Sequence, residues 1–109
     1  MNVNVYGVTY EIIELKGDKF YNNLFEIEHD KNEVDLGRCL NVAQAILINE
    51  SLEEDTKRLT LMHELAHAII FVLGYGKMNE ETIAQFVAAH HDFIDNVVTD
   101  WKEYNDNSR

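Results

Sequence analysis

The chain contains no proline, a single cysteine and only nine basic residues against twenty acidic ones. One cysteine cannot form an internal disulfide, and a free thiol is typical of a reducing compartment. The formal net charge of −11 argues against a basic face for binding nucleic acid or an anionic membrane surface. The sequence therefore predicts a solvated acidic surface that would attract a basic protein or peptide rather than a polyanion.

Long apolar runs are also missing. No stretch approaches the roughly 18 consecutive apolar residues that a membrane-spanning helix needs. Residues 1–5 have neither the basic segment nor the apolar core of a signal peptide. We therefore expect a cytoplasmic protein with no membrane contact, and the length of 109 residues predicts one domain over residues 1–109.

The first half of the chain has the two-residue periodicity of β-strands. Residues 3–15 alternate around Gly7 as a β-hairpin does, and residues 44–49 are a good strand. Residues 24–28 and 33–40 are weaker candidates for extended structure. We expect three to five short strands between about residues 3 and 49, in an antiparallel or mixed sheet whose strand order is not readable.

The second half has helical periodicity instead. A helix over about residues 52–73 is predicted by apolar residues three and four positions apart, by a capping box of Ser51 and Glu54, and by a stop at Gly74. A second helix over about residues 80–104 carries its own apolar stripe. The fold class is therefore α+β, with a small N-terminal sheet packed on one central helix and one C-terminal helix.

The central helix contains His63-Glu64-Leu65-Ala66-His67, an H-E-x-x-H motif. Helical spacing of i and i+4 places both imidazoles on one face, where they can ligate one metal ion. Glu64 projects about 100° away from His63 around the helix axis and can act on a water without ligating the metal. This is the arrangement of zinc peptidases: one Zn²⁺ ion, two histidine ligands and one acid–base carboxylate.

A catalytic zinc needs a third protein ligand from outside the motif. The metzincin form is excluded, because Leu73 stands where that form has a third histidine. A carboxylate at the start of the second helix is the alternative, either Glu80 or Glu81. We favour Glu80, which shares a helix face with the apolar Ile83, but Glu81 lies on a face with the small Ala84 and stays open. Acidic residues also stabilise helix starts without any metal.

Five further residues have chemically active side chains. His90, His91 and Tyr75 are candidates for stabilising an oxyanion, although the histidines are more often packing residues. His29 lies in a polar context and is expected to be exposed. Cys39 is isolated from the other ligand types and is not expected to bind the metal.

The run of residues 60–68 around the motif, followed by residues 79–83, resembles the ImmA/IrrE-like zinc metallopeptidases, most closely their small relatives from phages and mobile elements. The run 44–49 resembles the strand before their active-site helix, and the resemblance covers roughly residues 37–90. It implies a minimal zincin-like domain. Better-known members cleave repressor proteins and often carry DNA-binding or sensor segments, for which this chain has no room.

The family's downstream motif, E-x-x-A-N-x-F-A, is matched imperfectly. Aligning Phe86 with the aromatic position selects Glu80 as the metal ligand, whereas aligning Ala84 with the alanine selects Glu81. The resemblance therefore leaves the same two alternatives as the helical spacing.

These features predict a zinc-dependent endopeptidase that acts on a protein or peptide substrate, with Glu64 as general base. The strand 44–49 is a candidate edge for aligning an extended substrate by β-addition. One alternative is a non-proteolytic, protein-binding module in which zinc only fixes the two helices, and a weaker one is a metal-free interaction domain. A structural zinc site is closed by four protein ligands, whereas a catalytic site keeps one position for water.

Overall fold

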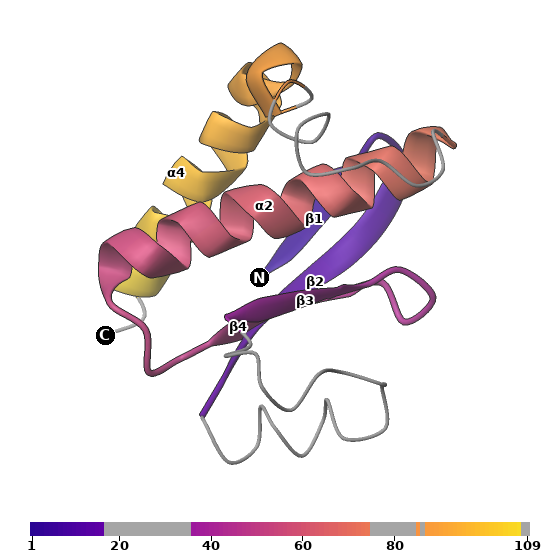
Figure 1. Ribbon diagram of the computed structural model, residues 1–109. Helices are drawn as coiled ribbons and strands as arrows, with labels where there is room; N and C mark the ends of the chain where they lie inside the picture. The colour runs from indigo at the N-terminus through magenta and orange to yellow at the C-terminus, as the bar shows by residue number, and fades with distance from the viewer. Residues whose placement is uncertain (17–35, 75–84, 86, 108–109) are drawn as a thin grey trace.

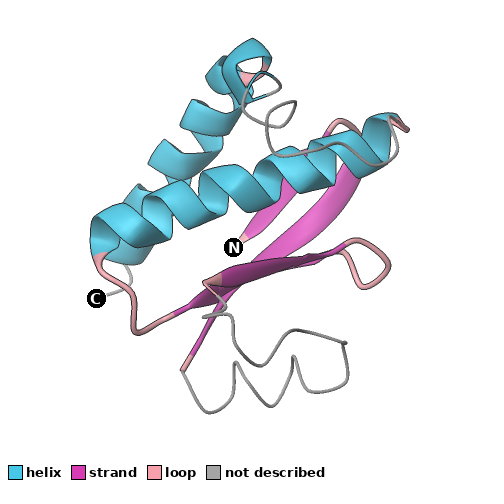
Figure 2. Cartoon of the chain, in the orientation of Figure 1, coloured by secondary structure: helices cyan, strands magenta, loops and turns pink. Residues whose placement is uncertain are grey.

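The computed structural model describes residues 1–16, 36–74, 85 and 87–107. Four strands form one mixed sheet: β1 (Asn2–Val5), β2 (Val8–Leu15), β3 (Gly37–Leu40) and β4 (Ala45–Asn49). Two helices follow, α2 (Glu54–Leu73) and α4 (His91–Asn107). In Figure 1, α2 crosses one face of the sheet and α4 packs beside it. Figure 2 shows both helices on the same side of the sheet, which confirms the predicted α+β class.

The sheet has the order β1-β2-β4-β3. The β1–β2 pair is the predicted hairpin, with Tyr6 and Gly7 at its tip. Both tip residues have positive φ, 47° and 99°, as a two-residue type I′ turn requires, and Asn4 Oδ1 accepts the Gly7 N–H at 2.7 Å. In contrast, β2 pairs with β4 in parallel, and β4 pairs with β3 in antiparallel.

The position of β4 corrects the expectation that residues 44–49 form a sheet edge. Since β4 pairs on both sides, with β2 and with β3, its backbone N–H and C=O groups are already used within the sheet. Among the described strands, β1 and β3 are the outermost ones. The five residues of β4 are all buried, which fits an interior strand.

The core lies between the sheet and the two helices. Its members from the sheet alternate along each strand, and the helices contribute one buried stripe each. The fully buried large side chains are Val5, Tyr10, Ile46, Ile48, Leu61, Leu65, Ile69 and Ile94. The other face of the sheet carries a smaller cluster of Leu47 with Ile13, Leu15 and Leu40.

The start of α2 differs from the predicted capping box. The helix begins at Glu54, its N-cap is Glu53, and no side chain caps it. Ser51 instead donates its hydroxyl and its backbone N–H to Asn49 Oδ1, at 2.6 and 3.0 Å. Asn49 is buried at the end of β4 and engages Ser51 locally, so the box was a wrong prediction. The predicted stop is confirmed, because Gly74 ends the helix in the left-handed conformation with φ 76°.

The predicted helix over residues 80–104 is also corrected. Residues 87–89 are helical, but the chain turns at His90, whose carbonyl accepts the Ile94 N–H at 3.1 Å and so starts α4. Tyr6 contacts this junction from the hairpin: its ring stacks on Phe93 with centroids 5.0 Å apart. No glycine or proline marks the junction in the sequence, so the apolar spacing continues through it. The possible strand over residues 24–28 and the residues at 80–84 lie outside the described residues.

Candidate metal centre

The two motif histidines converge on one point. His63 Nε2 and His67 Nε2 are 3.0 Å apart, and the ring centroids are separated by 4.7 Å with the ring planes at 74°. Two nitrogens bound to one tetrahedral zinc, each about 2.0–2.1 Å from it, would be about 3.3 Å apart. Both side chains are partly exposed on α2. The pair therefore fits a zinc ion with little movement of either ring.

Glu64 completes the described cluster. One carboxylate oxygen and one nitrogen from each histidine all lie within 4.8 Å of one another. Among the residues that the structure describes, His63, Glu64 and His67 form the cluster of histidine and acidic side chains that could hold a metal ion. Glu64 is only 7% exposed, whereas the histidines are more open, so the carboxylate is the inner member of the group.

An ion pair links α2 to the sheet two turns before Glu64. Lys57 Nζ lies 2.7 Å from Glu14 Oε1 on β2, and the Lys57 side chain is 8% exposed. Lys57 and Glu64 are seven residues apart and thus share one helix face, the face toward the sheet. The pair therefore joins α2 to β2 on the side of the helix where Glu64 is also buried.

Strand β3 covers Glu64 on the sheet side. Positions 37 and 39 of β3 pair with Ile48 and Ile46, whose side chains lie in the core between the sheet and α2. A Cβ built on Gly37 would be 3.5 Å from Glu64 Cγ. This contact could not be predicted from the sequence, because residues 37 and 64 are far apart in the chain and a lone glycine indicates only a turn or a close approach.

Next to Glu64, a small polar network surrounds Cys39. Its Sγ donates to Asn41 Oδ1 at 3.2 Å, and the Tyr10 hydroxyl donates to the same oxygen at 2.8 Å. Burial, with the negative charge of Glu64 as the lesser cause, raises the pKa of Cys39 to about 12. Burial and the neighbouring Cys39 raise the pKa of Tyr10 to about 12 as well. Cys39 is thus a protonated thiol at neutral pH in this environment.

The remaining candidate residues have separate positions. His90 Nδ1 shares a hydrogen bond with the Tyr6 hydroxyl at 3.1 Å, and His91 lies 3.2 and 3.5 Å from the carboxylates of Asp92 and Asp95. Neither histidine belongs to the group around Glu64. Four candidates from the sequence lie outside the described residues: Glu80, Glu81, Tyr75 and His29.

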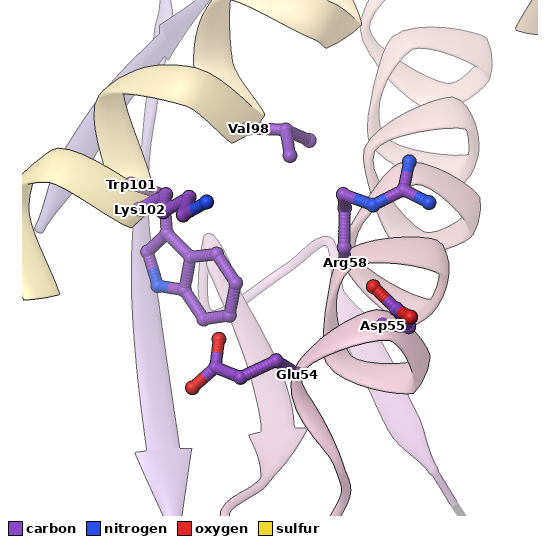
Figure 3. Close-up of a pocket in the computed structure, with 6 residues that line it drawn as sticks. All are labelled: Glu54, Asp55, Arg58, Val98, Trp101 and Lys102. Carbon is purple, nitrogen blue, oxygen red and sulfur yellow. The ribbon is translucent and has the colours of Figure 1, made fainter.

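A separate hollow lies between the first turns of α2 and the second half of α4 (Figure 3). Its volume is about 100 Å³, and it is lined by Glu54, Asp55, Arg58, Val98, Trp101 and Lys102. Both signs of charge occur in its wall, and no member of the His63–Glu64–His67 group lines it. The hollow is therefore distinct from the metal centre.

Comparison with known proteins gives one match. The family model Peptidase_M78, described as the IrrE N-terminal-like domain, matches residues 10–94, a span that contains strands β3 and β4, helix α2 and all three clustered residues. No curated protein and no solved structure matches the chain. No described helix is long and apolar enough to cross a membrane.

Proposed function

Because the chain belongs to the IrrE N-terminal-like domain family of peptidases, we propose that it is a zinc-dependent metallopeptidase that hydrolyses a peptide bond in a protein or peptide substrate. The observation that carries the proposal is the 3.0 Å separation of His63 Nε2 and His67 Nε2 beside the buried Glu64. The distance is that of an N–H···N hydrogen bond between the two rings, and the same convergence would let both nitrogens ligate one ion.

His63 and His67 would hold the ion through Nε2. When bound, zinc supplies a Lewis acid for the scissile carbonyl and lowers the pKa of an attacking water towards about 7. Glu64 accepts a proton from this water at its carboxylate and returns it to the amine leaving group. The low exposure of Glu64 favours this proton transfer, because the surrounding side chains limit the orientations that the carboxylate can adopt.

We propose Glu80 as the third ligand and keep Glu81 as the alternative. Val87, seven residues or two helical turns after Glu80, packs against Ala66 and Ile70 on α2. Ile70 is also seven residues after His63, on the stripe of α2 that carries both histidines. Ala88, which has the same spacing from Glu81, is exposed. The spacing in the sequence from Val87, which packs on α2, and from the exposed Ala88 therefore favours Glu80 over Glu81 in this proposal.

A substrate would pair with β3 rather than with β4. Asn49 N–H donates to Leu36 O across the β3–β4 pair, so in this register the backbone groups of Gly37 and Cys39 point away from β4. Since no other described strand pairs with β3 on that side, we propose that an extended peptide adds there as a further strand beside Glu64. Backbone N-methylation of a cleaved peptide near its scissile bond should then slow hydrolysis by at least about tenfold. Equal rates for the methylated and unmethylated peptides would contradict this pairing.

The proposed function is tested with purified protein by elemental analysis and by hydrolysis of fluorescein-labelled casein. We expect one zinc per chain, hydrolysis that a chelator abolishes, and a loss of at least about 100-fold in Glu64→Gln with zinc retained. His91→Gln is the matched control and should keep both zinc and activity. Zinc bound at full occupancy without hydrolysis would indicate the alternative, a zinc-stabilised module that binds another protein, and absence of zinc would contradict both.

A further inference from the structure

Strand β3 approaches α2 closely at Gly37. A Cβ at this position would lie 2.6 Å from Thr60 Cγ2 and 2.8 Å from the Leu47 carbonyl oxygen. Carbon atoms in contact are normally about 3.5–4.0 Å apart, so any other side chain must displace the strand or the helix. The requirement is one of space, toward Thr60 on α2 and toward the Leu47 backbone on β4, and not of a positive φ.

Thr60 cannot easily make room for a larger residue. Its hydroxyl donates to the Thr56 carbonyl oxygen at 2.7 Å, and the side chain is 7% exposed. A β-branched side chain in a helix has few χ1 rotamers, and this hydrogen bond selects one of them. Cγ2 is therefore held toward β3, and a methyl group at position 37 would move the strand rather than the threonine.

Glu64 follows Thr60 by one helical turn on the same face, and its Cγ is the third atom that a Cβ at position 37 would contact, at 3.5 Å. Cys39, the next inward residue of β3, lies close enough for the charge of Glu64 to act on its thiol. The stem of Glu64 thus packs on Gly37 and its carboxylate lies under the same strand. The distance between β3 and α2 decides where that carboxylate stands relative to His63 and His67.

We propose that Gly37 is a positioning residue for Glu64: by leaving room for Thr60, it seats β3 against the stem of Glu64 and fixes the carboxylate beside the metal ligands. This inference rests on the proposed function, in which Glu64 carries the proton. The backbone of Gly37 would pair with a substrate, as proposed above, but its effect on Glu64 comes from the space that it leaves for Thr60. A shift of about 1 Å in an acid–base group can cost on the order of 100-fold in rate, so a single methyl group at this position has a large expected effect.

The experiment compares zinc-loaded wild type with Gly37→Ala, Thr60→Ser and the double variant. The zinc dissociation constant of Gly37→Ala should stay within about twofold of wild type, because both histidines are on α2. Its kcat for labelled casein should fall by at least about tenfold, with a smaller change in KM. Its affinity for acetohydroxamate, which chelates zinc and hydrogen-bonds to the acid–base carboxylate, should fall by about threefold or more.

Thr60→Ser supplies the rescue. It removes Cγ2 but keeps the hydroxyl that bonds to Thr56, so the double variant should regain part of both the lost kcat and the lost acetohydroxamate affinity. Val97→Ala is the matched control for stability, since it removes core volume on α4, away from β3. It should lower the unfolding midpoint while kcat per folded molecule stays at the wild-type value.

Wild-type values of kcat and acetohydroxamate affinity in Gly37→Ala, or no recovery in the double variant, would overturn the inference alone. If wild type binds zinc without cleaving casein, the acetohydroxamate affinities decide the inference while the proposed function fails. A wild-type protein that binds no zinc would overturn the proposed function and the inference with it.

Discussion

Replacing Lys57 by methionine should be among the most destabilising single changes in α2. Lys57 Nζ lies 2.7 Å from Glu14 Oε1, and the two side chains are 8% and 22% exposed. Lys57→Met keeps the length and the apolar stem of the side chain, so packing is largely conserved. The Glu14 carboxylate, however, loses its cationic partner while one of its oxygens remains buried.

The magnitude follows from that uncompensated charge. Breaking a buried ion pair by removing one partner typically costs about 3–5 kcal/mol. Because Glu14 is 22% exposed, water can reach part of the carboxylate, and we expect about 3 kcal/mol, the lower end of the range. Removing both charges, in Lys57→Met with Glu14→Gln, should cost less than Lys57→Met alone, with a coupling energy of about 1–3 kcal/mol.

Urea denaturation measures this directly. Trp101 is the single tryptophan and is 4% exposed in the core, so its fluorescence reports loss of the packing between α4 and the sheet. With a urea m-value of about 1.5 kcal/mol/M, the midpoint for Lys57→Met should fall by about 2 M. A loss below about 1 kcal/mol, or strictly additive effects in the double variant, would refute the view that this pair fixes α2 on the sheet.

Three other outcomes are expected. Leu65→Ala, at a fully buried site facing the core, should lower the free energy of unfolding by about 2–5 kcal/mol in the same urea assay. Zinc at 100 times its dissociation constant should stabilise the protein by about 2.7 kcal/mol in thermal unfolding, an effect that His67→Ala abolishes and His91→Ala does not. The pKa values of Cys39 and Tyr10 are raised to about 12, from 9.0 and 10.0. The stability that these two protonated groups contribute is therefore complete below pH 9 and is lost as the pH rises towards 12. A Cys39→Ala protein should lose less stability between about pH 9 and 12, and an equal loss would contradict the role of Cys39.

Local patterns predicted the elements of this fold better than their pairing. The hairpin around Gly7 and the helix that ends at Gly74 are both present, because each depends on residues close in sequence. The parallel pairing of β2 with β4 joins segments some thirty residues apart, and no periodicity encodes it. This pairing makes β4 an interior strand, and so the expected edge was placed on the wrong strand.

Two errors arose where a long-range or competing contact overrode a local signal. Ser51 had the correct spacing from Glu54 for a capping box, but the buried Asn49 engages its hydroxyl instead. The helix predicted over residues 80–104 has a turn at His90, where Tyr6 from the distant hairpin contacts both His90 and Phe93. In both cases the residue composition alone was compatible with the predicted structure.

The candidate metal centre also has one part that local sequence predicts and one part that depends on long-range contacts. Its histidines are positioned by the helix alone, since residues i and i+4 meet wherever α2 is helical, and the motif was therefore readable from the sequence. The role of Glu64 needs more than the helix, because an exposed carboxylate at the same position would be free to rotate into solvent. In the structure, Gly37 and Cys39 on β3 lie beside Glu64, and the ion pair between Lys57 and Glu14 joins the same side of α2 to β2. The convergence of the two proposed histidine ligands is thus a local property of α2, whereas the orientation of Glu64, the proposed acid–base group, depends on the packing of the sheet on the helix. On the proposed function, variants that alter this packing should reduce catalysis before they reduce zinc binding.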